Sequence, residues 1–171
     1  MPIVSPIPLN PLADGRQSDR AMLVRRGVQR LLIEMGAVAI PELPLATGRR
    51  ADLVALTRRG DIWIVEIKSS VEDFRADRKW PEYRLWCDRF FFATHPGVPE
   101  AIFPGECGFI LSDGYGAEML REAPEHRLPA ATRKALTLRI ARAGAARLTA
   151  AEMAGVAIPT PDGPALDGEG E

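Results

Sequence analysis

The stretch from Arg49 to Ser70 most constrains the fold, because it reads as a β-hairpin that carries charged residues on an apolar surface. Two segments rich in Val, Ile, Leu and Trp, Arg50–Leu56 and Asp61–Lys68, are separated by a short polar loop that ends in Gly60. A three-residue hairpin loop typically ends in a glycine in the left-handed conformation. The stretch therefore predicts two antiparallel strands joined by this loop.

The turn also sets the register of the two strands. Pairing outward from the loop gives three facing pairs, which are Leu56 with Ile62, Val54 with Ile64, and Asp52 with Glu66. Side chains alternate along a strand, so Lys68, two residues beyond Glu66, points to the same face. Two carboxylates and one ammonium group are thus expected close together.

This arrangement needs a compensating charge. Facing Cβ atoms lie roughly 5 Å apart, and like charges at that spacing destabilise a strand pair. Burial beside apolar side chains would also raise the pKa of a lone carboxyl group. A divalent cation between Asp52 and Glu66 removes the conflict, and carboxylate oxygens are suitable ligands for Mg²⁺. Lys68 then adds a positive charge that can hold an attacking water or a developing phosphate charge.

A plainer interpretation treats Asp52 as a polar strand-end residue and Glu66–Lys68 as a surface ion pair of little energy. The lysine content argues against it. The chain has 22 lysine and arginine residues, and only Lys68, Lys79 and Lys134 are lysine. An ammonium group is compact and a guanidinium is a planar fork, so a lysine here in an arginine-rich chain favours a metal-dependent site.

The same residues carry a family resemblance. An Asp, a gap of thirteen residues, and then Glu-Ile-Lys on an apolar strand resembles the PD-(D/E)xK nuclease superfamily. The wider stretch is similar to the MmcB-like DNA-repair proteins of bacteria, over about residues 16 to 157. The segments that carry this similarity are Glu66-Ile67-Lys68-Ser69-Ser70, Asp73-Phe74-Arg75-Ala76-Asp77, Lys79-Trp80-Pro81-Glu82-Tyr83 and Cys87-Asp88-Arg89-Phe90.

The resemblance implies a role for each residue of the motif. In the superfamily the Asp and Glu bind Mg²⁺ or Mn²⁺, the residue between Glu and Lys lends its backbone carbonyl, and the Lys assists phosphodiester hydrolysis. These roles fall on Asp52, Glu66, Ile67 and Lys68. The chain departs from the pattern in having Ala51, not Pro, before the Asp. Many members also carry a Glu on the first helix, for which this sequence has no identified counterpart.

Contacts to DNA are expected at the rim of the site. Arg50 and Lys79 are candidates for phosphate contacts. Lys79 and Tyr83 are spaced to share one face of a helix, and some relatives use a Gln-x-x-x-Tyr pair there to contact the substrate near the metal, with Gln where this chain has Lys. The alternative, that Trp80, Tyr83 and Trp86 form a core stripe, stays open.

Charge adds one constraint on nucleic-acid binding. The net charge is −1, so no global field attracts a polyanion. Residues 130–148 contain five basic residues and no acid, whereas residues 156–171 contain four acids and no base. Phosphate contacts must therefore come from local basic patches.

The remaining segments predict the rest of the fold. We expect helices at Gln17–Met35, Val71–Arg78, Trp80–Cys87 and Ala130 to about Arg147, a new helix start at Thr149, and strands at Ala37–Leu45, Arg89–Thr94, Gly108–Leu111 and Ala117–Arg121. Arg89–Thr94 should lie parallel to Asp61–Lys68. This order, like the resemblance, predicts an α/β fold, a restriction-endonuclease-like sandwich with a central mixed β-sheet flanked by helices.

The domain prediction is an irregular N-terminal arm over residues 1–15, one nuclease-like domain over residues 16–157, and a flexible acidic tail over residues 158–171. Two cysteines without a C-x-x-C motif, no secretory signal and no apolar run long enough to cross a bilayer indicate the cytoplasm.

The predicted function is a divalent-metal-dependent DNA endonuclease, or nuclease-like protein, acting in DNA repair with Mg²⁺ or Mn²⁺. The expected partner is DNA, with branched, nicked and single-stranded forms as candidates. A homodimer and repair-complex proteins are further candidate partners. Two alternatives stay open: a non-catalytic DNA-binding or repair-complex scaffold that retains the nuclease fold, and a nuclease acting on RNA.

Overall fold

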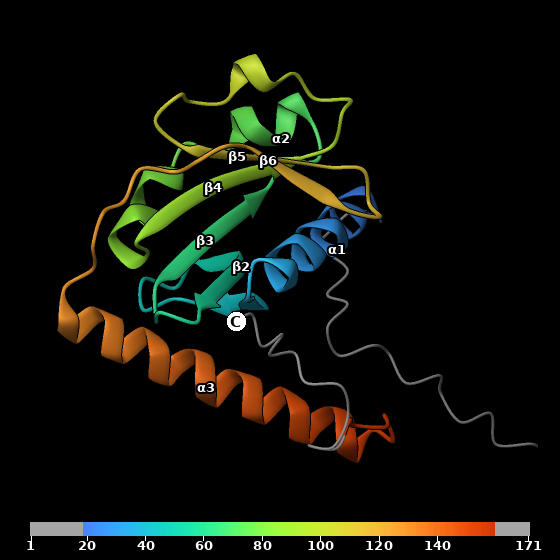
Figure 1. Ribbon diagram of the computed structural model, residues 1–171, viewed down its shortest axis with the longest axis vertical. Coiled ribbons are helices and arrows are strands. Elements are labelled where there is room, and N and C mark those ends of the chain that lie inside the picture. The colour runs from blue at the N-terminus through green and yellow to red at the C-terminus, as the bar shows by residue number, and fades with distance from the viewer. Residues whose placement is uncertain (1–18, 160–171) are drawn as a thin grey trace, which may run out of the picture.

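The structure, a computed structural model, describes residues 19–159 (Figure 1). The predicted arm, the predicted helix start at Gln17 and the part of the predicted tail beyond residue 159 lie outside this range. Along the chain the elements are α1 (Asp19–Glu34), β1 (Ala37–Pro44), β2 (Arg50–Thr57), β3 (Ile62–Ile67), α2 (Val71–Ala76), the 3-10 helix η1 (Trp80–Trp86), β4 (Arg89–Thr94), the 3-10 helix η2 (Glu100–Ile102), β5 (Gly108–Ser112), β6 (Ala117–Arg121) and α3 (Ala130–Met153).

The strands form one six-stranded sheet in the order β1-β2-β3-β4-β5-β6. The pairs β1–β2, β2–β3 and β5–β6 are antiparallel, whereas β3–β4 and β4–β5 are parallel. The prediction that Arg89–Thr94 lies parallel to the second hairpin strand is confirmed. The proline-containing first strand lies at an edge, as expected for a strand that lacks some N–H donors.

Helices cover both faces of this sheet. The apolar side of α1, with Val24, Val28 and Leu32, packs on odd-numbered sheet residues such as Val65 and Phe91. The opposite core gathers the even-numbered residues of β3 and β4 together with side chains of α2, η1 and α3. Alternation along these two central strands thus separates the two cores, whereas in β2 and β5 the odd-numbered Ala51 and Phe109 also lie in this second core. The predicted α/β sandwich, a mixed central sheet flanked by helices, is confirmed.

The segment between β3 and β4 differs from its prediction. The helix α2 ends at Ala76, because Asp77 takes an extended conformation, and η1 follows as a 3-10 helix with Pro81 in its first turn. A 3-10 helix has three residues per turn, and Lys79 lies just before it as its N-cap. Lys79 and Tyr83 therefore do not share one face of an α-helix.

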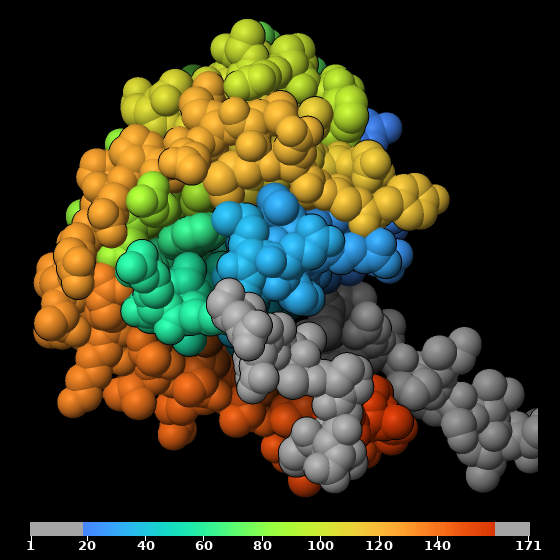
Figure 2. Space-filling view, viewed as in Figure 1, coloured from blue at the N-terminus to red at the C-terminus, as the bar shows by residue number. Residues whose placement is uncertain are grey.

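The last helix also differs from its prediction. It is continuous from Ala130 to Met153, so there is no new start at Thr149. The Thr149 hydroxyl donates to the Ala145 carbonyl, four residues earlier, a bond that satisfies it within the helix. The predicted inward side is confirmed, with Leu136 buried and Ile140 and Ala143 packed against the same core. Figure 2 shows α3 along one border of the molecule.

None of the helices within residues 19–159 combines the length and the apolar character that crossing a membrane requires.

Candidate active site

The β2–β3 hairpin positions the predicted acids, and its turn has the expected geometry. Gly60 has a φ of 84°, in the left-handed region. The Thr57 amide donates to the Asp61 carbonyl over 3.0 Å, and the Asp61 amide donates to the Thr57 hydroxyl over 3.0 Å. The predicted pairs Leu56–Ile62 and Val54–Ile64 are both present, but the predicted pair Asp52–Glu66 is not, because regular pairing of the two strands stops at Leu53–Val65. The local turn therefore sets the register that the sequence implied for the pairs nearest to it.

Asp52 and Glu66 lie side by side where the regular pairing of the two strands ends. The Asp52 amide donates to Oε1 of Glu66 over 3.0 Å. The Ile67 amide donates to Oδ2 of Asp52 over 2.8 Å. Each carboxylate thus accepts a hydrogen bond from the backbone of the strand opposite its own. These two bonds hold both acids in fixed positions on the sheet.

Burial makes these two carboxylates hard to ionise. Glu66 is only 4% exposed. Burial raises the pKa of Asp52 to about 6, although the hydrogen bond from Ile67 and the charge of Lys68 act in the opposite direction. Burial, followed by the charge of Asp52, raises the pKa of Glu66 well above its usual range. The pair is therefore short of positive charge in the protein alone.

Lys68 lies next to the acids, but its ammonium group binds a third carboxylate. Lys68 Nζ donates to Oδ2 of Asp77 over 2.8 Å, and Lys68 is 5% exposed. Burial lowers the pKa of Lys68, but the bond to Asp77 and the charge of Glu66 outweigh that effect, so the pKa is raised. Its backbone is held by Ala93, whose carbonyl accepts from the Lys68 amide, and by Thr94, whose hydroxyl donates to the Lys68 carbonyl.

The three predicted DNA-contact residues occupy different environments. Tyr83 is buried, its ring stacks on Phe90, and its hydroxyl donates to the Arg50 carbonyl over 3.1 Å. Arg50 is half-buried, and its Nε lies 2.5 Å from Oε2 of Glu42. Lys79 is exposed. Their contacts to DNA stay predictions, and the structure places Tyr83 as a support beneath the strand that carries Asp52. Trp80 packs on the same core.

Asp77 and Glu42 are two residues near the site to which the sequence assigned no role. Asp77 ends α2, and its Oδ1 also accepts from the Lys79 amide over 3.1 Å. Glu42 has a positive φ of 54°, which is uncommon outside glycine. Its charge raises the pKa of Asp52. Asp77 lies within a motif of the family resemblance, which is a signal that could have singled it out. Neither Asp77 nor Glu42 shows a hydrophobic or turn pattern that would have done so.

Within residues 19–159, no three or more His, Cys, Asp or Glu side chains form a group that could hold a metal ion by themselves. Asp52 and Glu66 are therefore a pair of acids without a third side-chain ligand in this part of the chain. Any cation here would take its other ligands from the backbone, from water or from a substrate, which is common for Mg²⁺.

The raised pKa of Asp52 predicts that the stability of the folded protein depends on pH, and that Asp52→Asn should remove this dependence. The folded pKa is about 6, against an ordinary value of 3.8. Between these values the folded state binds more protons than the unfolded state, so the free energy of unfolding falls as pH rises. With a chelator present, the thermal midpoint of Asp52→Asn minus that of the wild type should increase between about pH 4 and pH 7, by an amount equivalent to roughly 3 kcal/mol at most. Calorimetry of both proteins across this range checks it, and a difference that is constant with pH would contradict it.

The chain was compared with known proteins. Residues 9–155 match the family described as DNA repair protein MmcB-like. No curated protein matches the chain. A solved protein of unknown function from Silicibacter pomeroyi is 39% identical, with a TM-score of 0.78, and the match covers 84% of this chain and 99% of that chain. A solved repair endonuclease from Pyrococcus abyssi is 19% identical, with a TM-score of 0.34, and that match covers 52% of this chain and 42% of that one. The family match spans most of the chain, and the chain therefore belongs to the MmcB-like family of DNA repair proteins.

Proposed function

We propose that the protein is a divalent-metal-dependent deoxyribonuclease that acts in DNA repair. The observation that carries the proposal is the pair of half-buried Asp52 and buried Glu66, with the buried Lys68 beside it. Each carboxylate accepts a hydrogen bond from an amide of the other strand, over 3.0 Å for Glu66 and 2.8 Å for Asp52. Membership of a DNA repair family supports DNA as the substrate. Branched, nicked and single-stranded DNA are the forms that a repair nuclease would meet.

The residues present fit Mg²⁺ or Mn²⁺. Both acids have pKa values raised by burial, which means that a nearby positive charge would stabilise their ionised forms. A carboxylate has two oxygens, each of which can accept more than one contact. The hydrogen bonds from the backbone amides use one oxygen of each acid, so the other oxygen can bind an ion. An extended residue projects its N–H and C=O toward the same neighbouring strand, so the Ile67 carbonyl is on the Asp52 side. Asp52, Glu66 and Ile67 would hold the ion, which when bound would lower the pKa of a coordinated water and polarise the scissile phosphate.

Lys68 would act as a cation, not as a base. Its raised pKa keeps it protonated at neutral pH, so it has no lone pair with which to accept a proton. A buried ammonium group next to the acids would instead orient the attacking water and stabilise the negative charge that develops on the phosphate. Arg50 and Lys79 would contact phosphates on either side of this centre.

A non-catalytic DNA-binding scaffold is the second candidate. Two observations favour it: the lack of a third acidic ligand within residues 19–159, and the occupation of the Lys68 ammonium group by Asp77. Such a protein would bind DNA, alone or with other repair proteins, without needing a metal ion.

Metal titration separates the two candidates. Calorimetry with Mn²⁺ should give one saturable binding event for the wild type, weakened at least tenfold in Asp52→Asn because that variant removes one charged ligand. The wild type should then cut nicked, branched or single-stranded DNA only with Mg²⁺ or Mn²⁺ present. A wild type that binds no Mn²⁺, and that binds DNA equally well with and without a chelator, would support the scaffold. Cutting of RNA but not of DNA would contradict the choice of substrate.

A further inference from the structure

The long helix α3 is attached to the sheet along a narrow strip. It has 24 residues, of which Leu136 is the one that is buried. Polar bonds supplement this small apolar contact, because Arg139 donates to the Pro44 carbonyl over 3.1 Å and Arg147 donates to the carbonyls of Pro41 and Glu42. Most of the surface of α3 therefore faces solvent and takes no part in packing against the core.

The charge on this surface is of one sign. From residue 126 to residue 151 the chain has six Lys and Arg residues and no Asp or Glu. Arg133 is neutralised by Asp88, with Nη2 and Oδ1 2.6 Å apart. Arg139 and Arg147 donate to backbone carbonyls. A carbonyl carries no net charge, so these bonds do not neutralise the positive charges of the two arginines. Residues 130–151 of the helix thus carry an excess of positive charge, with Glu42 close to Arg147 only.

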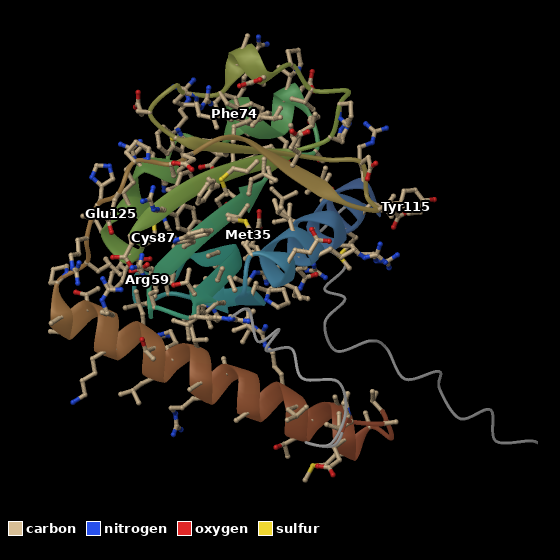
Figure 3. All side chains as sticks on the ribbon, in the orientation of Figure 1. Met35, Arg59, Phe74, Cys87, Tyr115 and Glu125 are labelled. Atoms are coloured by element: carbon tan, nitrogen blue, oxygen red, sulfur yellow. The ribbon has the colours of Figure 1, made fainter. Side chains whose placement is uncertain are left out.

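Within α3 itself, Lys134, Arg139 and Arg142 are the exposed basic residues, and we call them the α3 basic face. Lys134, Leu138 and Arg142 are spaced four residues apart, so they follow one line along the helix. Side chains that end in nitrogen project from the side of α3 that faces away from the sheet (Figure 3). The exposed Leu138 lies on this line between the two cations.

A groove runs beside this face, between α3 and the edge strand β1. It has a volume of about 600 Å³, and Arg139, Arg142 and Leu138 line one wall while Leu43 and Pro44 line the other. The two arginines on the α3 side of this groove suit a ligand that presents a row of anions.

The basic face continues toward the candidate active site. Arg139 is bonded to Pro44, and Pro44 pairs with Arg50 across β1 and β2. Arg50 lies two residues before Asp52 on the same strand. Arg50 is paired with Glu42, so what links the α3 basic face to the strand of Asp52 is the contact of Arg139 with the sheet edge at Pro44.

We infer that the α3 basic face binds the phosphate backbone of duplex DNA that flanks the site of cleavage. The inference rests on the proposed function and adds to it a surface that sets where the duplex lies. Regularly spaced cations on a helix complement the regularly spaced phosphates of one strand, and such contacts confer affinity without sequence preference. Because the surface lies away from the acids, losing it should weaken DNA binding and leave metal binding intact.

The test compares two doubly substituted proteins with the same change in net charge. Lys134→Gln/Arg142→Gln removes two charges from the α3 basic face. Arg20→Gln/Arg26→Gln removes two exposed charges from α1, which covers the opposite face of the sheet. Fluorescence anisotropy with a labelled, nicked DNA duplex, in the presence of a chelator so that no cutting occurs, gives the Kd at several salt concentrations.

We expect the α3 variant to bind about tenfold more weakly at low salt, with the slope of log Kd against log salt reduced by about two, one for each phosphate interaction that the substitutions remove. The α1 variant should retain the wild-type Kd within about twofold, and both variants should bind Mn²⁺ as the wild type does.

Equal weakening in both variants would overturn the inference, because it would reflect net charge alone. Wild-type affinity in both would overturn it too, and metal-dependent cutting by the wild type would show that the proposed function survives. A wild type that binds no DNA at any salt concentration would overturn both. An RNA duplex bound in preference to DNA, and no longer bound by the α3 variant, would overturn DNA as the occupant.

Discussion

Replacing Lys68 with alanine should lower the rate of metal-dependent DNA cleavage by roughly 10²–10³-fold while the protein stays folded. The ammonium group is buried beside Glu66 and is 2.8 Å from Asp77. It is thus an oriented positive charge in a place where little water screens it. Its loss removes the group that would stabilise the charge developing on the phosphate. The measurement is the single-turnover rate with Mn²⁺ at saturating protein.

Two comparisons show whether the effect comes from the ammonium group. Lys68→Arg keeps the charge but substitutes a planar fork for a compact group, so we expect most of the rate to be lost as well. Mn²⁺ affinity should persist in Lys68→Ala, because the proposed ligands are Asp52, Glu66 and the Ile67 carbonyl. Undiminished cutting by Lys68→Ala would remove Lys68 from the mechanism.

Removing the carboxylate of Asp88 should cost about 3–5 kcal/mol of the free energy of unfolding, the largest stability effect we expect. Asp88 is 1% exposed. Its oxygens accept from the amides of Ile62 and Leu128 over 2.7 Å and 2.9 Å, and from both terminal nitrogens of Arg133. The Asp88→Ala variant would leave two amides without their acceptor and the Arg133 guanidinium without its carboxylate partner, at the point where α3 joins the sheet.

The pKa of Asp88 is in keeping with this role. Burial raises it, but the bonds from Arg133, Ile62 and Leu128 outweigh burial and lower it. Asp88→Asn keeps one acceptor oxygen and should cost less than Asp88→Ala. Glu118→Ala, at an exposed position, should change stability by no more than about 0.5 kcal/mol. Urea unfolding of the three variants gives their free energies of unfolding and so checks this order of stability. If Asp88→Ala lost no more stability than Glu118→Ala, the prediction would be contradicted.

The hairpin was predictable because its determinants are local. Gly60 and the residues beside it specify the turn, the turn sets the register, and strand alternation then places Asp52 and Glu66 on one face. The observed pairs Leu56–Ile62 and Val54–Ile64 match that reasoning. The mixed sheet and the two-sided covering by helices followed in the same way from apolar runs of the right length and order.

Short-range reasoning was less successful where two influences competed. Thr149 and Glu152 resemble a helix start, yet the Thr149 hydroxyl bonds within an uninterrupted α3. Nine alanines among the 24 residues of that helix explain the outcome, because their high helix propensity outweighs a local capping signal. Likewise Pro81 correctly predicted a break, but not that the second piece would be a 3-10 helix.

The sequence by itself determined the hairpin, the register of the pairs nearest its turn and the fold class, because these depend on local spacing and on the order of apolar segments along the chain. Only the tertiary structure decided what those residues contact. It brought Asp77 to Lys68, Tyr83 under Arg50, and Arg133 to Asp88. These contacts join residues 9, 33 and 45 positions apart. Their partners are selected by how the helices pack on the sheet, and that depends on the shape of the whole core, which no local pattern encodes.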